Sequence, residues 1–134
     1  YPEKLIPLTV KLLMRGKKIK LHDKGEPIRN WLHSADTASA VVTLIEAEMN
    51  NGIYNVAGGF EQKNIDTVAK VIECYFGEKR SLNKYLDLSY NREGQDVRYA
   101  LNDDKLRSLS WRPQKKFDEE IEKIVEYYKN NFKW

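Results

Sequence analysis

The sequence predicts a mixed α/β domain, an α+β-like fragment in which short strands alternate with helices. Of its 134 residues, 41% are hydrophobic and 32% are charged, a globular balance that excludes collagen-like, coiled-coil and disordered chains. Apolar residues recur at helical spacing in several segments and alternate with polar residues in the shorter segments between them. Because neither an internal repeat nor a low-complexity tract is present, we expect one domain spanning residues 1–134.

The chain is predicted to begin with a helix followed by two short strands. Residues 4–14 place apolar side chains at mostly helical spacing, and Gly16 then stops the helix. The segments 18–22 and 28–33 each alternate polar and apolar residues, and the turn at 23–27 separates them. This pattern predicts a β-hairpin or a pair of short strands.

A second helix and a third strand are predicted next. Asp36 is expected to cap a helix that runs to about Met49. The side chains expected to face inward from this helix are Ala40, Val41, Leu44, Ile45 and Ala47. Residues 53–57 predict a short apolar strand, closed by the pair Gly58–Gly59, where the backbone can turn sharply or approach a ligand.

The central part of the chain predicts a third helix and further strands. Asn64 is expected to cap this helix, which ends at Gly77. Residues 86–90 predict another strand, and residues 98–101 one more.

Two helices are expected toward the end of the chain. A cap and first-turn acids at 102–104 (Asn-Asp-Asp) precede a short helix that reaches about Leu109, and residues 117–132 space their apolar side chains for one buried face. Trp31 and Trp111 are expected to lie in the core.

Charge is distributed unevenly, although the net charge is only +3. Residues 1–33 carry a net charge of +5 and residues 34–78 one of −5. The basic start suits an anionic ligand such as a phosphate group, but it equally fits a solvated helix and turn rich in lysine. A non-catalytic nucleic-acid-binding module is therefore a second hypothesis, although nucleic-acid binders usually show a denser basic stripe. No apolar run approaches the eighteen or so residues that span a bilayer, so we expect a soluble, cytoplasmic chain without a membrane partner.

Motifs for catalysis, metal binding and dinucleotide binding are not found. The chain has neither a G-x-G-x-x-G turn nor a P-loop. His22, His33 and the single cysteine, Cys74, fall on separate predicted elements, so we expect no metal site. The acids at 103–104 and 118–122 occupy first helical turns, where they stabilise the helix dipole. These residues favour a binding function over a catalytic one.

Five segments in register resemble the C-terminal, substrate-binding part of extended short-chain dehydrogenases/reductases that act on nucleotide sugars, most closely the dTDP-glucose 4,6-dehydratases. The segments are YPEKLIPL, KGEPIRNWLHSAD, YNVAGG followed by KNIDTV, NREGQDVRYALNDDKL and LSWRPQKKFDEEIEKIVEYY. UDP-sugar dehydratases and nucleotide-sugar epimerases carry similar strings and remain alternatives. The resemblance covers nearly the whole chain.

The resemblance implies that the catalytic half lies outside this chain. In that family an N-terminal Rossmann domain holds NAD and carries a Tyr-x-x-x-Lys pair, whereas Tyr85 and Tyr90 here are not followed by lysine at that spacing. The chain starts at Tyr1 rather than Met, so we expect a leading part to be missing. Alone, it should neither bind NAD nor catalyse. The resemblance further implies a full-length homodimer whose contacts come mainly from the missing domain, so this fragment is expected to be a monomer.

The resemblance also assigns substrate-binding residues for a nucleotide-diphosphate sugar. These are Lys4, Leu5, Lys20, Leu21, His22, Arg29, Asn55, Arg92, Gln95 and Asp96. Lys4 and Leu5 match nucleotide-contacting positions, and residues 20–22 match a strand that lines the base pocket, with Lys20 replacing the usual proline. Arg29 matches the arginine that reaches the diphosphate, a role suited to a planar guanidinium.

Some of these positions depart from the family pattern or allow a structural explanation. Glu93 and Gln95 stand where the family often has proline and histidine, and an acid beside a diphosphate would weaken binding unless it points away. Alternatively, Arg29 pairs with Glu26 on the surface, Asn55 satisfies a buried turn and Arg92 is a solvated loop residue.

Overall fold

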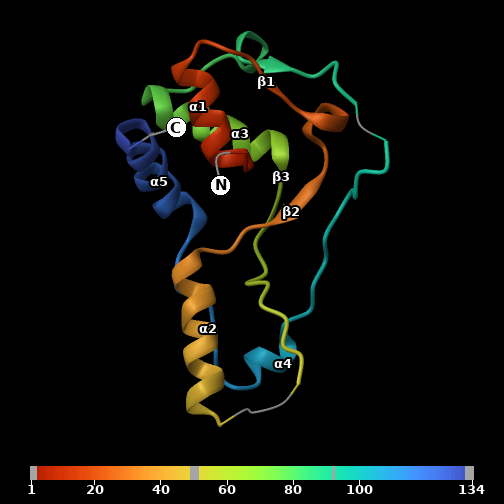
Figure 1. The fold of residues 1–134 in the computed structure, drawn as a ribbon, viewed down its shortest axis with the longest axis vertical. Coiled ribbons are helices and arrows are strands. Elements are labelled where there is room, and N and C mark those ends of the chain that lie inside the picture. The colour runs from red at the N-terminus through yellow and green to blue at the C-terminus, as the bar shows by residue number, and fades with distance from the viewer. Residues whose placement is uncertain (1–2, 49–51, 92, 132–134) are drawn as a thin grey trace.

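The computed structural model describes residues 3–48, 52–91 and 93–131. Three helices form the upper half of the molecule in Figure 1: α1 (Leu5–Met14), α3 (Asn64–Phe76) and α5 (Phe117–Asn131). Each packs on the other two, which confirms the three helices expected from apolar spacing. The side chains they bury together are Val10, Val71, Ile121 and Val125. At the end of α3, Gly77 adopts the left-handed conformation, as predicted for a glycine stop.

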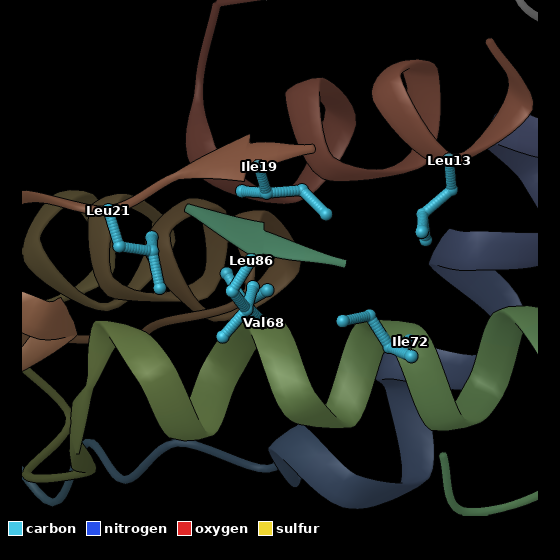
Figure 2. Close-up of a cluster of buried hydrophobic side chains, with 6 residues drawn as sticks. All are labelled: Leu13, Ile19, Leu21, Val68, Ile72 and Leu86. Atoms are coloured by element: carbon cyan, nitrogen blue, oxygen red, sulfur yellow. The ribbon is translucent and has the colours of Figure 1, made fainter. Parts of the chain in front are cut away.

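A two-stranded parallel sheet covers one side of α1 and α3. It pairs β1 (Ile19–Lys20) with β4 (Leu86–Asp87), and Figure 2 shows side chains from both strands meeting those of α1 and α3. The cluster contains Leu13, Ile19, Leu21, Val68, Ile72 and Leu86. Strand β4 is shorter than the predicted segment 86–90.

A second two-stranded sheet is antiparallel and links the two halves of the molecule. It pairs β2 (Ile28–Asn30) with β3 (Glu61–Lys63). The hairpin alternative is wrong: β1 and β2 are a pair of short strands, but each bonds to a different partner. The intervening 3₁₀ turn η1 (His22–Gly25) packs against the start of α3, where a Cβ on Gly25 would lie 2.7 Å from that of Ile65. This contact directs the chain away from β1.

Helix α2 (Ser34–Glu46) lies in the lower half and begins two residues before the predicted cap. The cap is His33, whose Nδ1 accepts a hydrogen bond from the N–H of Ala35 at 3.1 Å. Asp36 is therefore not the cap. It lies inside the first turn, is only 2% exposed, and accepts hydrogen bonds from a distant segment instead.

The predicted inward face of α2 is only partly correct. Ala40 is fully buried against Leu106 and Trp111, and Leu44 packs at the edge of this cluster. Val41 and Ile45 are 51% and 70% exposed. Ala47, past the end of the helix, is exposed too. The lower half is thin, so only one side of α2 is covered by the described chain.

The remaining connections are short or extended. A second 3₁₀ turn, η2 (Leu82–Lys84), leads into β4, and α4 (Asp104–Arg107) confirms the predicted short helix. Residues 53–57 are extended but form no ladder with another described segment, so the predicted strand there is wrong. Residues 98–101 contribute a single bridge between Arg98 and Ile28. None of the helices in the described ranges is long and apolar enough to cross a membrane.

Candidate functional site

Residues 88–91 and 93–103, which we call the tether segment, lie along one side of the molecule between β4 and α4 and are mostly extended (Figure 1). The neighbouring elements that it passes are β1, η1, β2 and the extended residues 53–57, in that order. Five of the sequence-predicted residues contact this segment or the strand that precedes it. They are Lys20, Leu21, His22, Arg29 and Asn55. The structure thus brings residues from three separate parts of the chain beside one segment.

Arg29 lies in β2 with its guanidinium held against the tether segment. Its Nη1 donates to the carbonyl oxygens of Ile28 at 2.8 Å and Asp96 at 3.1 Å. Its Cζ lies 4.4 Å from the centroid of the Tyr99 ring, within cation–π range. Within the described residues, no carboxylate forms an ion pair with Arg29. A guanidinium of this kind keeps its charge available for an anion.

The surface ion pair between Arg29 and Glu26 is not formed. Glu26 instead pairs with Nζ of Lys63, at 2.7 Å across the β2–β3 sheet. The same hydrogen bond raises the pKa of Lys63 above its ordinary value. The acid nearest to Arg29 in the sequence therefore already has a cationic partner.

Neighbouring contacts fix the tether segment against β2. The N–H of Ile28 donates to the carbonyl of Val97 at 2.7 Å. The Arg98 guanidinium donates two hydrogen bonds, of 2.9 and 2.6 Å, to the carboxylate of Glu61 in β3. These bonds lower the pKa of Glu61. Backbone pairing thus holds β2 between β3 on one side and the tether segment on the other.

A second group of contacts lies near β1. The rings of His22 and Tyr90 are 4.5 Å apart, and Nζ of Lys20 lies 5.9 Å from the centroid of the Tyr90 ring. Nδ1 of His22 is buried and has no hydrogen-bond partner within the described residues. Leu21, by contrast, is 3% exposed and its side chain belongs to the hydrophobic cluster of Figure 2.

Asn55 and the residues around position 95 complete the described part of the candidate site. Asn55 is exposed, and its Nδ2 donates to the carbonyl of Asn102 at 3.0 Å, so it binds the tether segment rather than a buried turn. Gln95 is half-buried, Asp96 is exposed, and both follow Gly94, which turns the chain at a φ of 73°. Arg92 lies outside the described residues.

Lys4 and Leu5 occupy a different place. Lys4 precedes the first residue of α1 and is exposed, whereas Leu5 packs at the edge of the cluster beneath β1. Within the described residues, no hydrogen bond or ring contact joins either side chain to the tether segment.

The glycine pair does not form a cradle for a dinucleotide such as NAD. A Cβ on Gly58 would lie 2.6 Å from Cδ1 of Leu32, so the missing side chain serves close packing inside the protein. The pair leads into β3 rather than into the first turn of a helix, where backbone N–H groups would face a pyrophosphate. The glycine pair therefore does not supply a dinucleotide-binding turn.

A cavity lies between the starts of α2 and α5, away from the tether segment. Its walls include the aromatic side chains of Trp31, Phe60 and Phe117, and none of the sequence-predicted site residues lines it. Trp31 is half-buried at this cavity, whereas Trp111 is buried in the core as predicted.

Sequence reasoning missed the two tyrosines that contact the predicted basic residues. The sequence indicates Tyr90 only as the end of a predicted strand and as a rejected member of a catalytic pair, and Tyr99 only as part of a strand. Tyr99 is separated from Arg29 by 70 positions, so no local pattern connects them. The available local signal is that Tyr90 and Tyr99 flank the polar stretch NREGQDVR.

Comparison with known proteins gives a family match over residues 1–124, to the family described as GDP-mannose 4,6 dehydratase. The dTDP-glucose 4,6-dehydratase 1 of Escherichia coli K12 is 36% identical over 138 aligned positions, which cover 100% of this chain and 38% of that protein. This chain thus spans about two-fifths of the length of the curated relatives that it matches.

Solved structures give the same fold. The dTDP-glucose 4,6-dehydratase of Streptomyces venezuelae, described with NAD and TYD bound, superposes with a TM-score of 0.85 at 29% identity, over 98% of this chain and 40% of that one. The UDP-glucuronic acid 4-epimerase of Bacillus cereus superposes with a TM-score of 0.82, over 98% and 41% of the two chains. Because the epimerase is only 16% identical, it supports the shared fold alone.

Proposed function

This chain belongs to the GDP-mannose 4,6 dehydratase family, and on that premise we propose that it is the substrate-binding part of an NAD-dependent nucleotide-sugar 4,6-dehydratase. The proposed reaction of the whole protein converts dTDP-glucose to dTDP-4-keto-6-deoxyglucose. The similarity to dTDP-glucose 4,6-dehydratases over the full length of this chain supports that choice.

One observation carries the proposal: the Arg29 guanidinium is ordered but has no acidic partner within the described residues. It is held by two carbonyl oxygens and an aromatic ring, which leave its positive charge uncompensated. Planar guanidinium groups bind two phosphate oxygens at once. We therefore assign Arg29 to the diphosphate of a nucleotide sugar.

The other predicted residues take places around that contact. His22, whose ring lies 4.5 Å from that of Tyr90 at an angle of 51°, would line the pocket of the nucleotide base. Asn55 and Gln95 would lie toward the sugar diphosphate. Leu21 would support the site from the core rather than by its own side chain.

Four residues have less structural support for their proposed roles. Lys4 and Leu5 would reach the nucleotide only from the start of α1. Asp96 would act near the diphosphate through its carbonyl, which accepts a hydrogen bond from Arg29, rather than through its carboxylate. Arg92 remains a proposal from the sequence.

We assign NAD to polypeptide outside this chain; the geometry of the Gly58–Gly59 pair, which leads into β3 and not into a helix, supports that assignment. When bound there, NAD would supply a hydride acceptor and donor for the sugar. The role of this chain is to bind and orient the nucleotide sugar, and we expect no turnover by the chain alone. We also assign the contacts of a homodimer to that outside part.

Binding measurements with matched variants test the proposal. We expect the chain to bind dTDP in a calorimetric or NMR titration, and Arg29→Ala to weaken binding about tenfold, the loss expected for one charge-assisted contact at a half-exposed site. Arg15→Ala removes the same charge from an exposed position at the end of α1 and should leave affinity unchanged. Equal affinity of Arg29→Ala and the parent would refute the assignment.

The same titration separates the alternatives. A dTDP-glucose dehydratase should prefer dTDP over UDP and GDP, whereas an epimerase or UDP-sugar dehydratase should prefer UDP. A nucleic-acid-binding module would instead bind single-stranded nucleic acid with affinity that falls steeply as salt rises.

A further inference from the structure

We propose that Tyr99 is a positioning residue for the diphosphate-binding arginine: its ring holds the Arg29 guanidinium in the orientation that binds phosphate. The inference rests on the function proposed above for Arg29. Its starting point is the 4.4 Å separation between Cζ of Arg29 and the centroid of the Tyr99 ring.

Asp96 connects the two side chains. Its main-chain carbonyl accepts a hydrogen bond from Nη1 of Arg29 at 3.1 Å. Its carboxylate interacts with the Tyr99 phenol and raises the pKa of Tyr99. Asp96 thus contacts the guanidinium through its backbone and acts on the Tyr99 side chain through its carboxylate.

The position of Tyr99 is not explained by the hydrophobic core. Its side chain is 51% exposed and belongs to none of the buried clusters. The preceding residue, Arg98, is bound to Glu61, and successive side chains of an extended segment point to opposite sides. The ion pair therefore turns Tyr99 toward Arg29.

This arrangement prepares the arginine for its ligand. A free arginine side chain loses up to about 2 kcal/mol of conformational entropy when it becomes ordered. Stacking on Tyr99 imposes that order before a ligand arrives. Within the described residues, the hydrogen bonds of Arg29 use Nη1 alone, so Nη2 and Nε can face two phosphate oxygens.

Titration with dTDP tests the role of the ring. Tyr99→Leu should weaken binding about two- to fivefold, the range expected from an exposed cation–π contact. Tyr99→Phe keeps the ring and should recover most of that loss. Tyr127→Leu is the matched control, because Tyr127 is 61% exposed on α5 and outside the candidate site, and it should bind like the parent.

Two further measurements distinguish positioning from general damage to the fold. In an Arg29→Ala background, Tyr99→Leu should cause no additional loss, because its effect passes through the guanidinium. In the ligand-free chain, the NMR signals of the Arg29 side chain should be shifted upfield by the Tyr99 ring, remain so in Tyr99→Phe, and move toward random-coil values in Tyr99→Leu.

The outcomes separate this inference from the proposed function. Loss of affinity in Arg29→Ala without any loss in Tyr99→Leu overturns the role of Tyr99 and leaves the function standing. An additional loss from Tyr99→Leu in the Arg29→Ala background, or identical Arg29 signals with and without the ring, overturns it as well. If the parent chain does not bind dTDP, or if Arg29→Ala has no effect, both proposals fall together.

Discussion

Replacing Asp36 by alanine should cost this chain about 3 kcal/mol of unfolding free energy, although the residue lies far from the candidate site. Its two carboxylate oxygens accept hydrogen bonds from the backbone N–H groups of Gln114 and Lys115, at 2.8 and 3.0 Å. The carboxylate thereby joins the first turn of α2 to the segment that precedes α5, 78 positions along the chain.

The magnitude follows from the number and environment of these bonds. Hydrogen bonds to a charged group contribute about 1.5–3 kcal/mol each, so two of them give at most about 6 kcal/mol. Gln114 and Lys115 are exposed residues, so water can reach part of their backbone after the carboxylate is removed, which favours the lower limit. Asp36→Asn keeps one acceptor oxygen and should cost about half as much.

Urea unfolding followed by circular dichroism measures the effect. With an m-value of about 2 kcal/mol/M, Asp36→Ala should lower the midpoint by about 1.5 M. Glu46→Ala removes an exposed acid from the other end of α2 and should leave the midpoint within about 0.3 M of the parent. If Asp36→Ala unfolds at the same midpoint as Glu46→Ala, the connection does not stabilise the fold.

Two further predictions concern the segment around the glycine pair. Gly58→Ala should destabilise the chain more than Gly77→Ala. Both glycines have positive φ, but of these two only position 58 would bring a Cβ against another side chain, that of Leu32 at 2.6 Å. The unfolding free energies of the two variants, measured in urea, should therefore differ by at least about 1 kcal/mol. Burial alone would raise the pKa of Asp103, but hydrogen bonds from Arg107 and from the N–H of Gly58 outweigh it and hold that pKa below its ordinary value. The stabilisation that the ionised Asp103 carboxylate contributes is therefore fully present above the unfolded pKa of about 4 and is lost as the pH falls through the lower folded pKa. In Asp103→Asn, the unfolding free energy should fall less steeply as the pH is lowered through the acid range.

Local patterns predicted the helices well because helix formation depends on neighbours three and four positions apart. The segments 4–14 and 117–132 were identified this way, and Gly77 ends its helix as expected. Strand pairing was not predictable, since β1 binds a strand that begins 67 positions after it. Strand β3 is entirely polar, so it carried no apolar alternation to detect.

The predicted face of α2 failed for a related reason. Val41 and Ile45 have the spacing of a buried face, but only the side that carries Ala40 meets the rest of the described chain. Amphipathic spacing indicates which residues favour burial; it does not show that a partner surface is present in the same chain.

The candidate site was accessible from the sequence only through resemblance. Composition suggested an anion near the start of the chain, but it could not single out Arg29 among eight basic residues in the first 33. The structure adds the reason for that choice, because Glu26 is paired with Lys63 and the arginine is not neutralised by it. The partnership with Tyr99 required the three-dimensional path of the tether segment.

The tether segment is attached to the rest of the chain largely outside the hydrophobic core. The tether segment is held by hydrogen bonds, the ion pair between Arg98 and Glu61 and ring contacts, while two of its apolar side chains, Val97 and Leu101, remain 66% and 55% exposed. It therefore buries little apolar surface, and its attachment to β2 should be among the weaker parts of the fold. A ligand that engages Arg29 together with the tether segment would join two elements that the core does not hold together. Because a ligand stabilises only the state that it binds, dTDP should slow amide exchange in the tether segment more than in α1 or α3, whose side chains are already buried in the core.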